Sequence, residues 1–486
     1  MSFIDGSAVN VALPVLERDF GAGAAATQWV IEGYALFLSA LLLAGGALGD
    51  RLGQRSVFGA GIALFALGSI ACALSPTIEF LIAARCIQGV GGALAVPGSL
   101  ALVTSAYDGA ERGKAIGVWS GFSAMSAAIG PVLGGWLVQT ASWRYVFAIN
   151  LPFALFVLFV LFKEVPESRD ESAKGRVDVV GAALATFGLG AVVYGLIAAQ
   201  NVRGDALAYA AIGAGVVALI AFLFYERSAK TPMLPFEVFR SSTFSFANVY
   251  TFFLYAALGG SLYFLPFDLI DVQGYSPAAA GAAQLPFVVI MFALSRFSGG
   301  LVARIGPRIP LLGGALLAGA GFLTFAFAGI GKSYWVSFFP GSVLLGFGGA
   351  LFVAPLTTTV MGAVERAHTG LASGVNNAVS RVAGLLAIAL LGLAFAGVFH
   401  YALQHDMGST TGVGPWVRGA VLREEPKLMA GDVPESLKQY PVVTDWMHDS
   451  YDTAFSAVMI LSSGLCLIAA GVAFGVGDPR QRQEPA

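Results

Sequence analysis

The chain has 486 residues, of which 57% are hydrophobic and 12% are charged, and its formal net charge is -2. Soluble domains carry about 25% charged residues, so this composition has too few charges for a water-facing globule. The near-zero net charge excludes a broad basic surface, and we expect no nucleic-acid partner. The composition predicts a polytopic, all-α membrane protein whose surroundings are the lipid bilayer.

The predicted helices are stretches of about 20 mostly apolar residues, which match the thickness of the hydrocarbon core. They are too long, and too evenly apolar, for the strands of a barrel. Fourteen such spans are predicted, at about 1–17, 28–49, 56–75, 79–103, 114–137, 145–163, 178–199, 206–226, 243–266, 278–301, 310–330, 336–361, 372–398 and 453–475. The first span has only a few residues before Asp5 and barely reaches membrane length.

Lys and Arg predict the orientation, because cytoplasmic loops are enriched in them. With both termini in the cytoplasm, the loops and tail on that side hold sixteen Lys and Arg, and the short outer loops hold four. We therefore predict a multi-pass protein of the bacterial inner membrane with both termini cytoplasmic. The segment 399–452 then lies outside, and it is too long for a plain connector. We expect it to form a small cap or an attachment for a periplasmic adaptor.

An internal repeat relates two loops, 46–55 and 299–308, which match at Gly, Leu, Arg, Gly and Arg. A repeat of this length predicts two homologous halves. The predicted units are a six-helix half 1–163, a linker 164–242 with two extra helices at about 178–199 and 206–226, a six-helix half 243–475, and a cytoplasmic tail 476–486.

Further motifs follow one another along the chain, at 5–14, 28–34, 85–91, 130–135, 143–152, 274–277 and 374–381. Together with the loop 46–55, they resemble the major facilitator superfamily and, more narrowly, its fourteen-span drug:proton antiporter subfamily. The resemblance covers nearly the whole chain. It implies two pseudo-symmetric six-helix halves with two extra central helices, and a first-span aspartate, here Asp5, that serves proton coupling. Ala303 departs from the fuller loop motif, which carries an acid.

Three charged side chains inside the spans are candidates for proton coupling, because a charge at mid-bilayer costs about 2.5–3.5 kcal/mol or more. Asp5 and Glu32 are candidate proton acceptors. Glu32 lies about one turn inside its span, so an interfacial acid is the alternative. Arg85 cannot be neutralised and needs an acidic or carbonyl partner. We expect Asp5 as that partner and Glu32 as the second choice, and a fixed structural ion pair is the alternative role.

The loop 46–55 is a candidate gate. Asp50 and the arginines are expected to pair with the inner ends of neighbouring helices or with Glu111 and Arg112, which would hold the inner side closed in the outward-open state. Simple positive-inside marking is the alternative. The candidate gating residues of this region are Gly46, Asp50, Arg51, Gly53, Arg55 and Arg112.

The fifth span carries a second candidate gate, formed by Gly130, Pro131, Gly134 and Gly135. Proline kinks a helix, and small residues allow a facing helix to approach closely. We expect a tight outer contact to a helix of the second half, with generic helix packing as the alternative.

Aromatic and polar residues within the spans are candidates for lining a lipophilic cavity. They are Tyr34, Gln88, Trp119, Phe122, Asn150, Asn248, Tyr255, Asn377 and Arg381. For the asparagines, hydrogen bonds between helices are the alternative. Asp268 and Asp271, at the outer end of the ninth span, are expected in a solvated loop.

The predicted function is proton-coupled export of lipophilic, often cationic, small molecules by alternating access, in a functional monomer driven by the proton gradient. A dedicated exporter of one metabolite, lipid or siderophore is the alternative. The sequence has no nucleotide loop of the GxxxxGK[ST] type, no HExxH or other ligand spacing and no nucleophile–base pattern, so we expect no cofactor, metal or catalytic residue. A channel is disfavoured because no filter or pore ring is evident.

Overall fold

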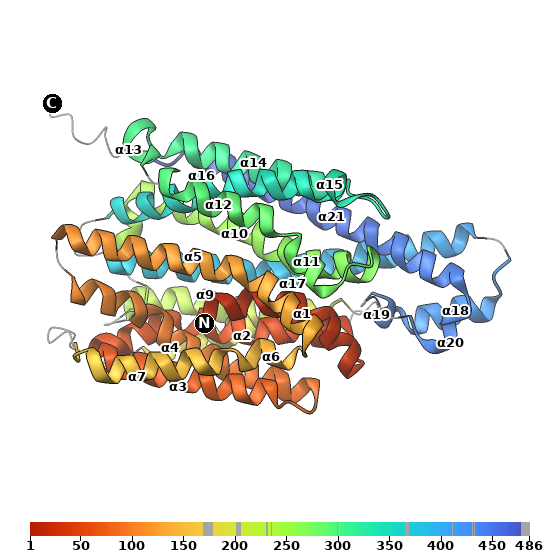
Figure 1. Ribbon diagram of the computed structural model, residues 1–486, viewed down its shortest axis with the longest axis horizontal. Coiled ribbons are helices and arrows are strands. Elements are labelled where there is room, and N and C mark those ends of the chain that lie inside the picture. Colours follow the sequence, from red (N-terminus) through yellow and green to blue (C-terminus); the bar gives the residue numbers. More distant parts are fainter. Residues whose placement is uncertain are drawn as a thin grey trace.

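The computed structural model describes residues 1–107, 109–168, 178–200, 206–229, 232–234, 236–298, 300–364, 369–410, 412–429, 431 and 433–477. Over these residues the fold is helical, and the helices lie side by side in one elongated bundle (Figure 1). Twelve helices in the described part are long and apolar enough to cross a membrane. The chain is therefore a multi-pass membrane protein, as the sequence predicted.

The first group of helices comprises α1 (Ser2–Phe20), α2 (Ala24–Leu52), α3 (Gln54–Ala73), α4 (Ile78–Ala106), α5 (Gly109–Thr140), α6 (Arg144–Ala148) and α7 (Asn150–Glu164). Helix α4 packs against α2 and α3, and α5 packs along α1. Glycine permits a close crossing of α3 and α4. A methyl group on Gly61 of α3 would lie 2.7 Å from the backbone nitrogen of Ala95 in α4.

The second group comprises α10 (Ser242–Phe267), η2 (Asp268–Val272), α11 (Pro277–Ala282), α12 (Leu285–Ser298), α13 (Leu301–Ile305), α14 (Arg308–Ala326), α15 (Tyr334–Ser337), α16 (Phe339–Gly362), α17 (Thr369–Ser409) and α21 (Pro441–Ala473). Helix α10 packs against α17 and α21, and α14 packs against α16 and α21. The span predicted at 278–301 is interrupted between α11 and α12. Pro286 explains the break, because it has no N–H to donate to the preceding turn.

The predicted extra helices are α8 (Val179–Ala198) and α9 (Ala206–Ser228), which form a hairpin. Helix α8 packs against α2 of the first group and α17 of the second. The hairpin therefore contacts both groups.

Helices α17 and α21 extend beyond the predicted spans, whose limits at 398 and 453 were wrong. Their extensions and the short helices α18 (Pro415–Arg423), α19 (Glu425–Leu428) and α20 (Glu435–Lys438) project from one end of the bundle (Figure 1). We call this projection the cap. Leu428 and Leu437 are fully buried in it. Below, the bundle end that carries the cap is the cap end, and the opposite end, with loop 46–55, is the loop end.

The predicted spans 1–17 and 114–137 correspond to α1 and α5, which are not among the twelve membrane-length apolar helices of the described part. Helix α1 has 19 residues and includes Asp5, Glu17, Arg18 and Asp19, which lowers its hydropathy. Both helices nevertheless pack within the bundle, α1 against α5 and α10, and α5 against α11 and α12.

Candidate functional site

A buried ion pair lies inside the first group. The Arg85 Nη1 atom of α4 donates to Asp5 Oδ2 of α1 at 2.6 Å, and both side chains are fully buried. Two side-chain amides and one hydroxyl complete the hydrogen-bond network around this ion pair. Gln88 Nε2 and Asn150 Nδ2 each donate to Asp5 Oδ1 at 3.0 Å, and both also reach the Ser69 hydroxyl, at 2.8 and 3.3 Å. The Asp5 carboxylate therefore joins α1 to α4 and α7 directly, and to Ser69 of α3 through the two amides.

The Arg85 side chain is held from several directions. Its Nε donates to the Val30 carbonyl of α2 at 2.9 Å, and its guanidinium carbon lies 4.3 Å from the Tyr34 ring centroid. Its Nη1 also donates to Gln88 Oε1 at 2.6 Å, which the i, i+3 spacing on α4 permits. Its Nη2 has no hydrogen-bond partner among the described residues. The pairing with Asp5 is the one expected from the sequence.

Glu32 does not take the second-choice place beside Arg85. Its side chain is fully buried on α2, with Gln28 one turn earlier as the polar neighbour on the same helix and Tyr263 of α10 close by. Both predicted roles of Glu32, proton acceptor and interfacial acid, therefore concern a carboxyl that the surrounding helices shield from solvent. Glu32 faces the boundary between the two groups.

The small residues of α5 form backbone contacts on two sides. A methyl group on Gly134 would lie 2.6 Å from the Ala8 carbonyl oxygen of α1. Gly130 likewise faces Ile4 and Ser7. On the other side, Gly135 meets the Pro277 carbonyl of α11.

The contact between α5 and α11 is reciprocal. Gly281 of α11 meets the Pro131 carbonyl of α5, and the Ala278 N–H donates to Gln139 Oε1 at 3.2 Å. The two groups of helices thus touch through their backbones in the cap-end half of α5. This places Pro131 and Gly135 at a junction between the groups, whereas Gly130 and Gly134 pack against α1 within the first group.

Asp268 and Asp271 also lie at this end, and the expectation of a solvated loop is wrong. Helix α10 continues into the π-helical turn η2, which buries Asp268 completely. Asp271 forms an ion pair with Arg18 of α1, and its side chain is 1% exposed. This pair is a second link between the groups at the cap end.

The loop 46–55 is held by the segment that follows α7. The Gln54 N–H donates to the Ser168 carbonyl at 2.8 Å, and Arg55 Nη1 donates to the Val165 carbonyl at 3.1 Å. Glu167 accepts hydrogen bonds from the Arg55 N–H at 2.9 Å and from the Ser56 hydroxyl. Of the two predicted kinds of partner for Arg55, the structure shows the end of a neighbouring helix rather than Glu111.

The remaining loop residues have local roles. Gly53 has φ +110, a conformation that side chains rarely adopt, and a methyl group there would also strike Glu167. Asp50 accepts a hydrogen bond from Gln54 Nε2 at 2.6 Å. Gly46 makes ordinary contact with Pro97, and Arg51 is half-buried. The side chain of Arg112 lies outside the described residues.

Replacing Glu167 with Gln is expected to lower the free energy of unfolding by about 1 kcal/mol near neutral pH, since Glu167 caps the start of α3. Burial raises the pKa of Glu167, but hydrogen bonds from Ser56, Arg55 and Ser168 and the Arg55 charge outweigh it, so the pKa is lowered from 4.5. The stabilisation is therefore complete above pH 4.5 and is lost as the pH falls through the folded-state pKa.

Thermal unfolding of the wild type and of Glu167→Gln in detergent, across the acid range, measures this difference. Glu164→Gln is the matched control, because the ion pair of Glu164 with Lys163 joins two side chains that are each 63% exposed. A Glu167→Gln deficit that stays constant down to pH values well below 4.5 would contradict the assignment.

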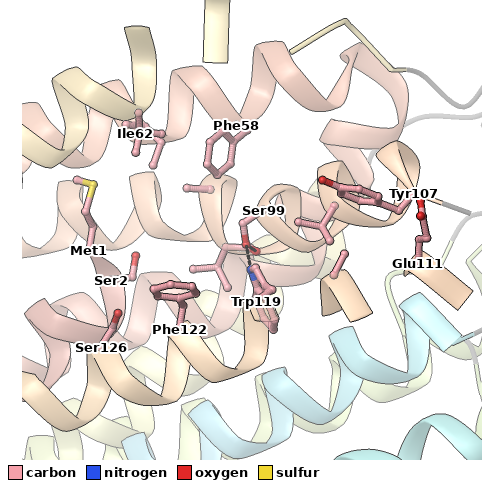
Figure 2. Close-up of a pocket in the computed structure, with 15 residues that line it drawn as sticks. Met1, Ser2, Phe58, Ile62, Ser99, Tyr107, Glu111, Trp119, Phe122 and Ser126 are labelled. Atoms are coloured by element: carbon pink, nitrogen blue, oxygen red, sulfur yellow. Dashed lines mark hydrogen bonds between the residues drawn. The ribbon is translucent and has the colours of Figure 1, made fainter. Parts of the chain in front are cut away.

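Two of the aromatic candidates line a cavity of about 730 Å³ (Figure 2). Trp119 donates from Nε1 to the Ser99 hydroxyl at 3.3 Å, and Phe122 is exposed beside it. Figure 2 shows Glu111 at one end of this cavity and Met1 at the other. All the lining residues belong to the first group, so the cavity lies within that group rather than between the two.

The other lining candidates are dispersed. Tyr34, Gln88 and Asn150 belong to the Asp5 network described above. Arg381 of α17 lies within electrostatic reach of Tyr34 in the first group and of Tyr255 in the second. Arg381 and Tyr255 therefore lie near the boundary between the groups, and neither of them lines the cavity of Figure 2.

The asparagines of the second group hold helices together. Asn376 Nδ2 of α17 donates to Asn248 Oδ1 of α10 at 3.1 Å, and to Thr251 at 2.7 Å. Asn377 donates to the Ser373 carbonyl of its own helix at 3.0 Å. For Asn248, the alternative of a helix-to-helix hydrogen bond is what the structure shows.

Several polar residues of these sites were missed in the sequence. Ser69 and Glu167 carry no pattern that singles them out. Glu17 and Gln28 lie at predicted span ends, where a polar residue is ordinary, yet they are 1% and 2% exposed. No group of three or more His, Cys, Asp or Glu suited to a metal ion occurs in the described part of the chain.

Comparison with known proteins relates the chain to transporters. The Major Facilitator Superfamily model matches residues 1–388. The multidrug resistance protein Stp of Mycobacterium tuberculosis (strain H37Rv) is 35% identical over 406 residues, covering 83% of this chain and 75% of Stp. The tetracenomycin C resistance and export protein of Streptomyces glaucescens is 32% identical over 485 residues, covering 97% of this chain and 88% of that protein.

The fold is also similar to solved transporters. The crystal structure of a bacterial homologue of the human lysosomal transporter Spinster, in an inward-facing conformation, has a TM-score of 0.64 at 18% identity and covers 100% of this chain and 96% of that one. This family consists of transporters and not of enzymes. The chain therefore belongs to the Major Facilitator Superfamily, and its relatives place it in the drug-export subfamily that the motifs indicated.

Proposed function

We propose that the protein is a proton-coupled secondary transporter that exports lipophilic compounds by alternating access. The observation that carries the proposal is the buried Asp5–Arg85 pair, linked by hydrogen bonds to α3, α4 and α7. Adding a proton to Asp5 removes the charge that holds Arg85 and Gln88 in place. Helix α1 packs against α5 and α10, so a rearrangement at Asp5 is transmitted to the boundary between the groups.

The structure is proposed to represent the state that is closed at the cap end. Supporting this are the α5–α11 backbone contact and the Arg18–Asp271 pair, which both join the two groups there. We propose that the cap end faces outward and that both termini are cytoplasmic, on the basis of the Lys and Arg distribution. Counting α1 and α5 as spans gives the fourteen-span arrangement. Rocking of one group against the other would then open the two ends in turn.

The cargo is proposed to be lipophilic, and often cationic, since Stp is named for multidrug resistance. A second candidate is an exporter dedicated to one compound. Its support is that other relatives are named for a single antibiotic, such as the puromycin resistance protein pur8 of Streptomyces alboniger, 33% identical over 421 residues and covering 86% of this chain and 84% of pur8. Transport of ethidium as well as puromycin favours the first candidate, and transport of one compound only favours the second.

Replacing Asp5 with Asn is expected to lower proton-driven efflux by about a hundredfold or more, the usual loss when a proton-transferring group is removed. The asparagine keeps an oxygen that can accept the Arg85 N–H, so the protein should still fold. The measurement is pH-gradient-driven transport of ethidium and puromycin by the full chain in proteoliposomes. Substrate counterflow without a gradient serves as the control for folding. Undiminished gradient-driven transport by Asp5→Asn would remove Asp5 from the mechanism.

A further inference from the structure

A small second cavity lies at the cap end, where α1 and α2 of the first group meet α10, α17 and α21 of the second. Its volume is about 30 Å³, which exceeds the roughly 10–15 Å³ needed to hold one water molecule. Its polar lining comes from Glu17, Gln28, Gln200, Tyr263 and Tyr451. A water molecule in this cavity would therefore have several polar partners.

The Gln28 amide supplies independent evidence for a bound water. Gln28 is 2% exposed, and its Oε1 accepts a hydrogen bond from Gln200 Nε2 at 2.9 Å. Its Nε2 makes no hydrogen bond of normal geometry among the described residues. The Glu32 carboxyl lies near the Gln28 side chain on the same helix, and Gln28 also lines the cavity. Leaving a buried donor unsatisfied is energetically costly, and a water molecule in this cavity would remove that cost.

Buried acids lie in and near this cavity. Glu17, which lines it, is 1% exposed, and Tyr263 lies within electrostatic reach of both Glu17 and Glu32. Tyr451 lies within reach of Glu17 and of the buried Asp268 at the cap end. Glu17, Tyr263 and Tyr451 thus line one cavity, and the buried acids Asp268 and Glu32 lie within electrostatic reach of these lining residues. Near Asp268, the other charged groups are Asp452 of α21 and Asp271, which is paired with Arg18.

We propose that this cavity holds a water molecule and that Glu17, this water and Tyr263 form a proton path between the cap end and Glu32. The proposal rests on the proposed function, because it supplies the route by which the coupling proton enters. In the transfer, the Glu17 carboxylic acid gives its proton to the water. The water passes one of its own protons, by way of the Tyr263 hydroxyl, to the Glu32 carboxylate. Each carrier gains one proton and loses one.

Two variants interrupt this path in different ways. Glu17→Gln removes the titratable group. Gly392→Ala places a methyl group 2.8 Å from Gln200 Nε2 and 3.2 Å from Gln28 Oε1, and so displaces the amides that line the cavity. Gly397→Ala is the matched control on the same helix α17, because a methyl group there meets nothing within 4 Å.

The experiment uses the full chain in proteoliposomes that contain a pH-sensitive dye, with ethidium and puromycin as probes. Glu17→Gln and Gly392→Ala are expected to lower probe-coupled proton flux by at least about tenfold, while probe counterflow without a gradient falls much less. Gly397→Ala should match the wild type. The proton path is overturned when both variants couple like Gly397→Ala, or when flux and counterflow fall together. Absence of coupling in the wild type instead overturns the proposed function.

The bound water is tested separately, without any transport. An experimental structure at a resolution that shows ordered water is expected to place one within hydrogen-bond distance of Gln28 Nε2. A dry cavity in the wild type would overturn the proposal, whatever the outcome of the flux measurements. The Gly392→Ala variant should lack this water, and the Gly397→Ala variant should retain it.

Discussion

Replacing Arg85 with Met is expected to lower the free energy of unfolding by about 3–5 kcal/mol, because it leaves the Asp5 charge buried without its partner. The two side chains are fully buried and 2.6 Å apart, so solvent cannot compensate for the loss. Met has a volume close to that of the lost side chain and no charge of its own. The measurement is thermal or denaturant-induced unfolding of the purified protein, with ligand and detergent held constant.

A double-mutant cycle with Asp5→Asn separates the pair from general packing. The combined variant Asp5→Asn, Arg85→Met has no buried charge left at this site, so it should recover most of the stability lost by Arg85→Met alone. Arg144→Met is the control, since Arg144 and Asp19 form an ion pair with side chains 42% and 54% exposed. Such pairs contribute about 1 kcal/mol or less. Additive losses in the cycle would show that Asp5 and Arg85 are not energetically coupled.

The centre of the site could be predicted because a charge within an apolar run is conspicuous. Asp5 and Arg85 lie inside predicted spans, and a buried arginine needs an acidic or carbonyl partner, so Asp5 was expected as that partner from elementary electrostatics. The partners Gln88 and Asn150 were selected as cavity candidates without a reason to link them to Asp5. Their spatial convergence depends on how α4 and α7 cross α1, and no single-sequence pattern specifies a crossing.

The ends of the bundle could not be predicted in the same way. A polar residue near the end of an apolar run is equally compatible with solvent and with a buried contact. Asp268 illustrates the ambiguity, because the continuation of α10 into a π-helical turn buries a residue expected in a loop. The helical extensions in the cap were not predicted for a related reason. Helices α17 and α21 continue into polar sequence, where hydropathy no longer indicates a helix.

The second large effect is expected from substitutions at the contact between α5 and α11, which was predicted from the sequence and is present in the structure. The pattern of small residues on the fifth span predicted a close contact with a second-half helix, and Gly135 and Gly281 lie against the Pro277 and Pro131 carbonyls. Neither glycine has room for a Cβ atom, and the obstructing atoms are backbone, which cannot rotate away. Larger residues here must separate the two helices.

Gly135→Val and Gly281→Val are each expected to destabilise the cap-end-closed state by about 1–3 kcal/mol, the usual cost of overpacking. That cost corresponds to a roughly fivefold to 150-fold fall in the ratio of closed to open molecules. Proton-driven efflux should fall at least as much, because alternating access requires both states. Spin labels on Thr140 and Lys332, which are exposed at the cap end of the two groups, should move apart in either variant.

The control for this prediction is Gly464→Val on α21, where an added methyl group meets nothing within 4 Å. It tests the effect of a β-branched residue in a long helix without a new clash. Because the contact is reciprocal, the two α5–α11 variants should have similar effects, and combining them should add little once the helices are apart. Label distances identical to those of the wild type, together with lost transport, would place the defect in folding rather than in closure of the cap end.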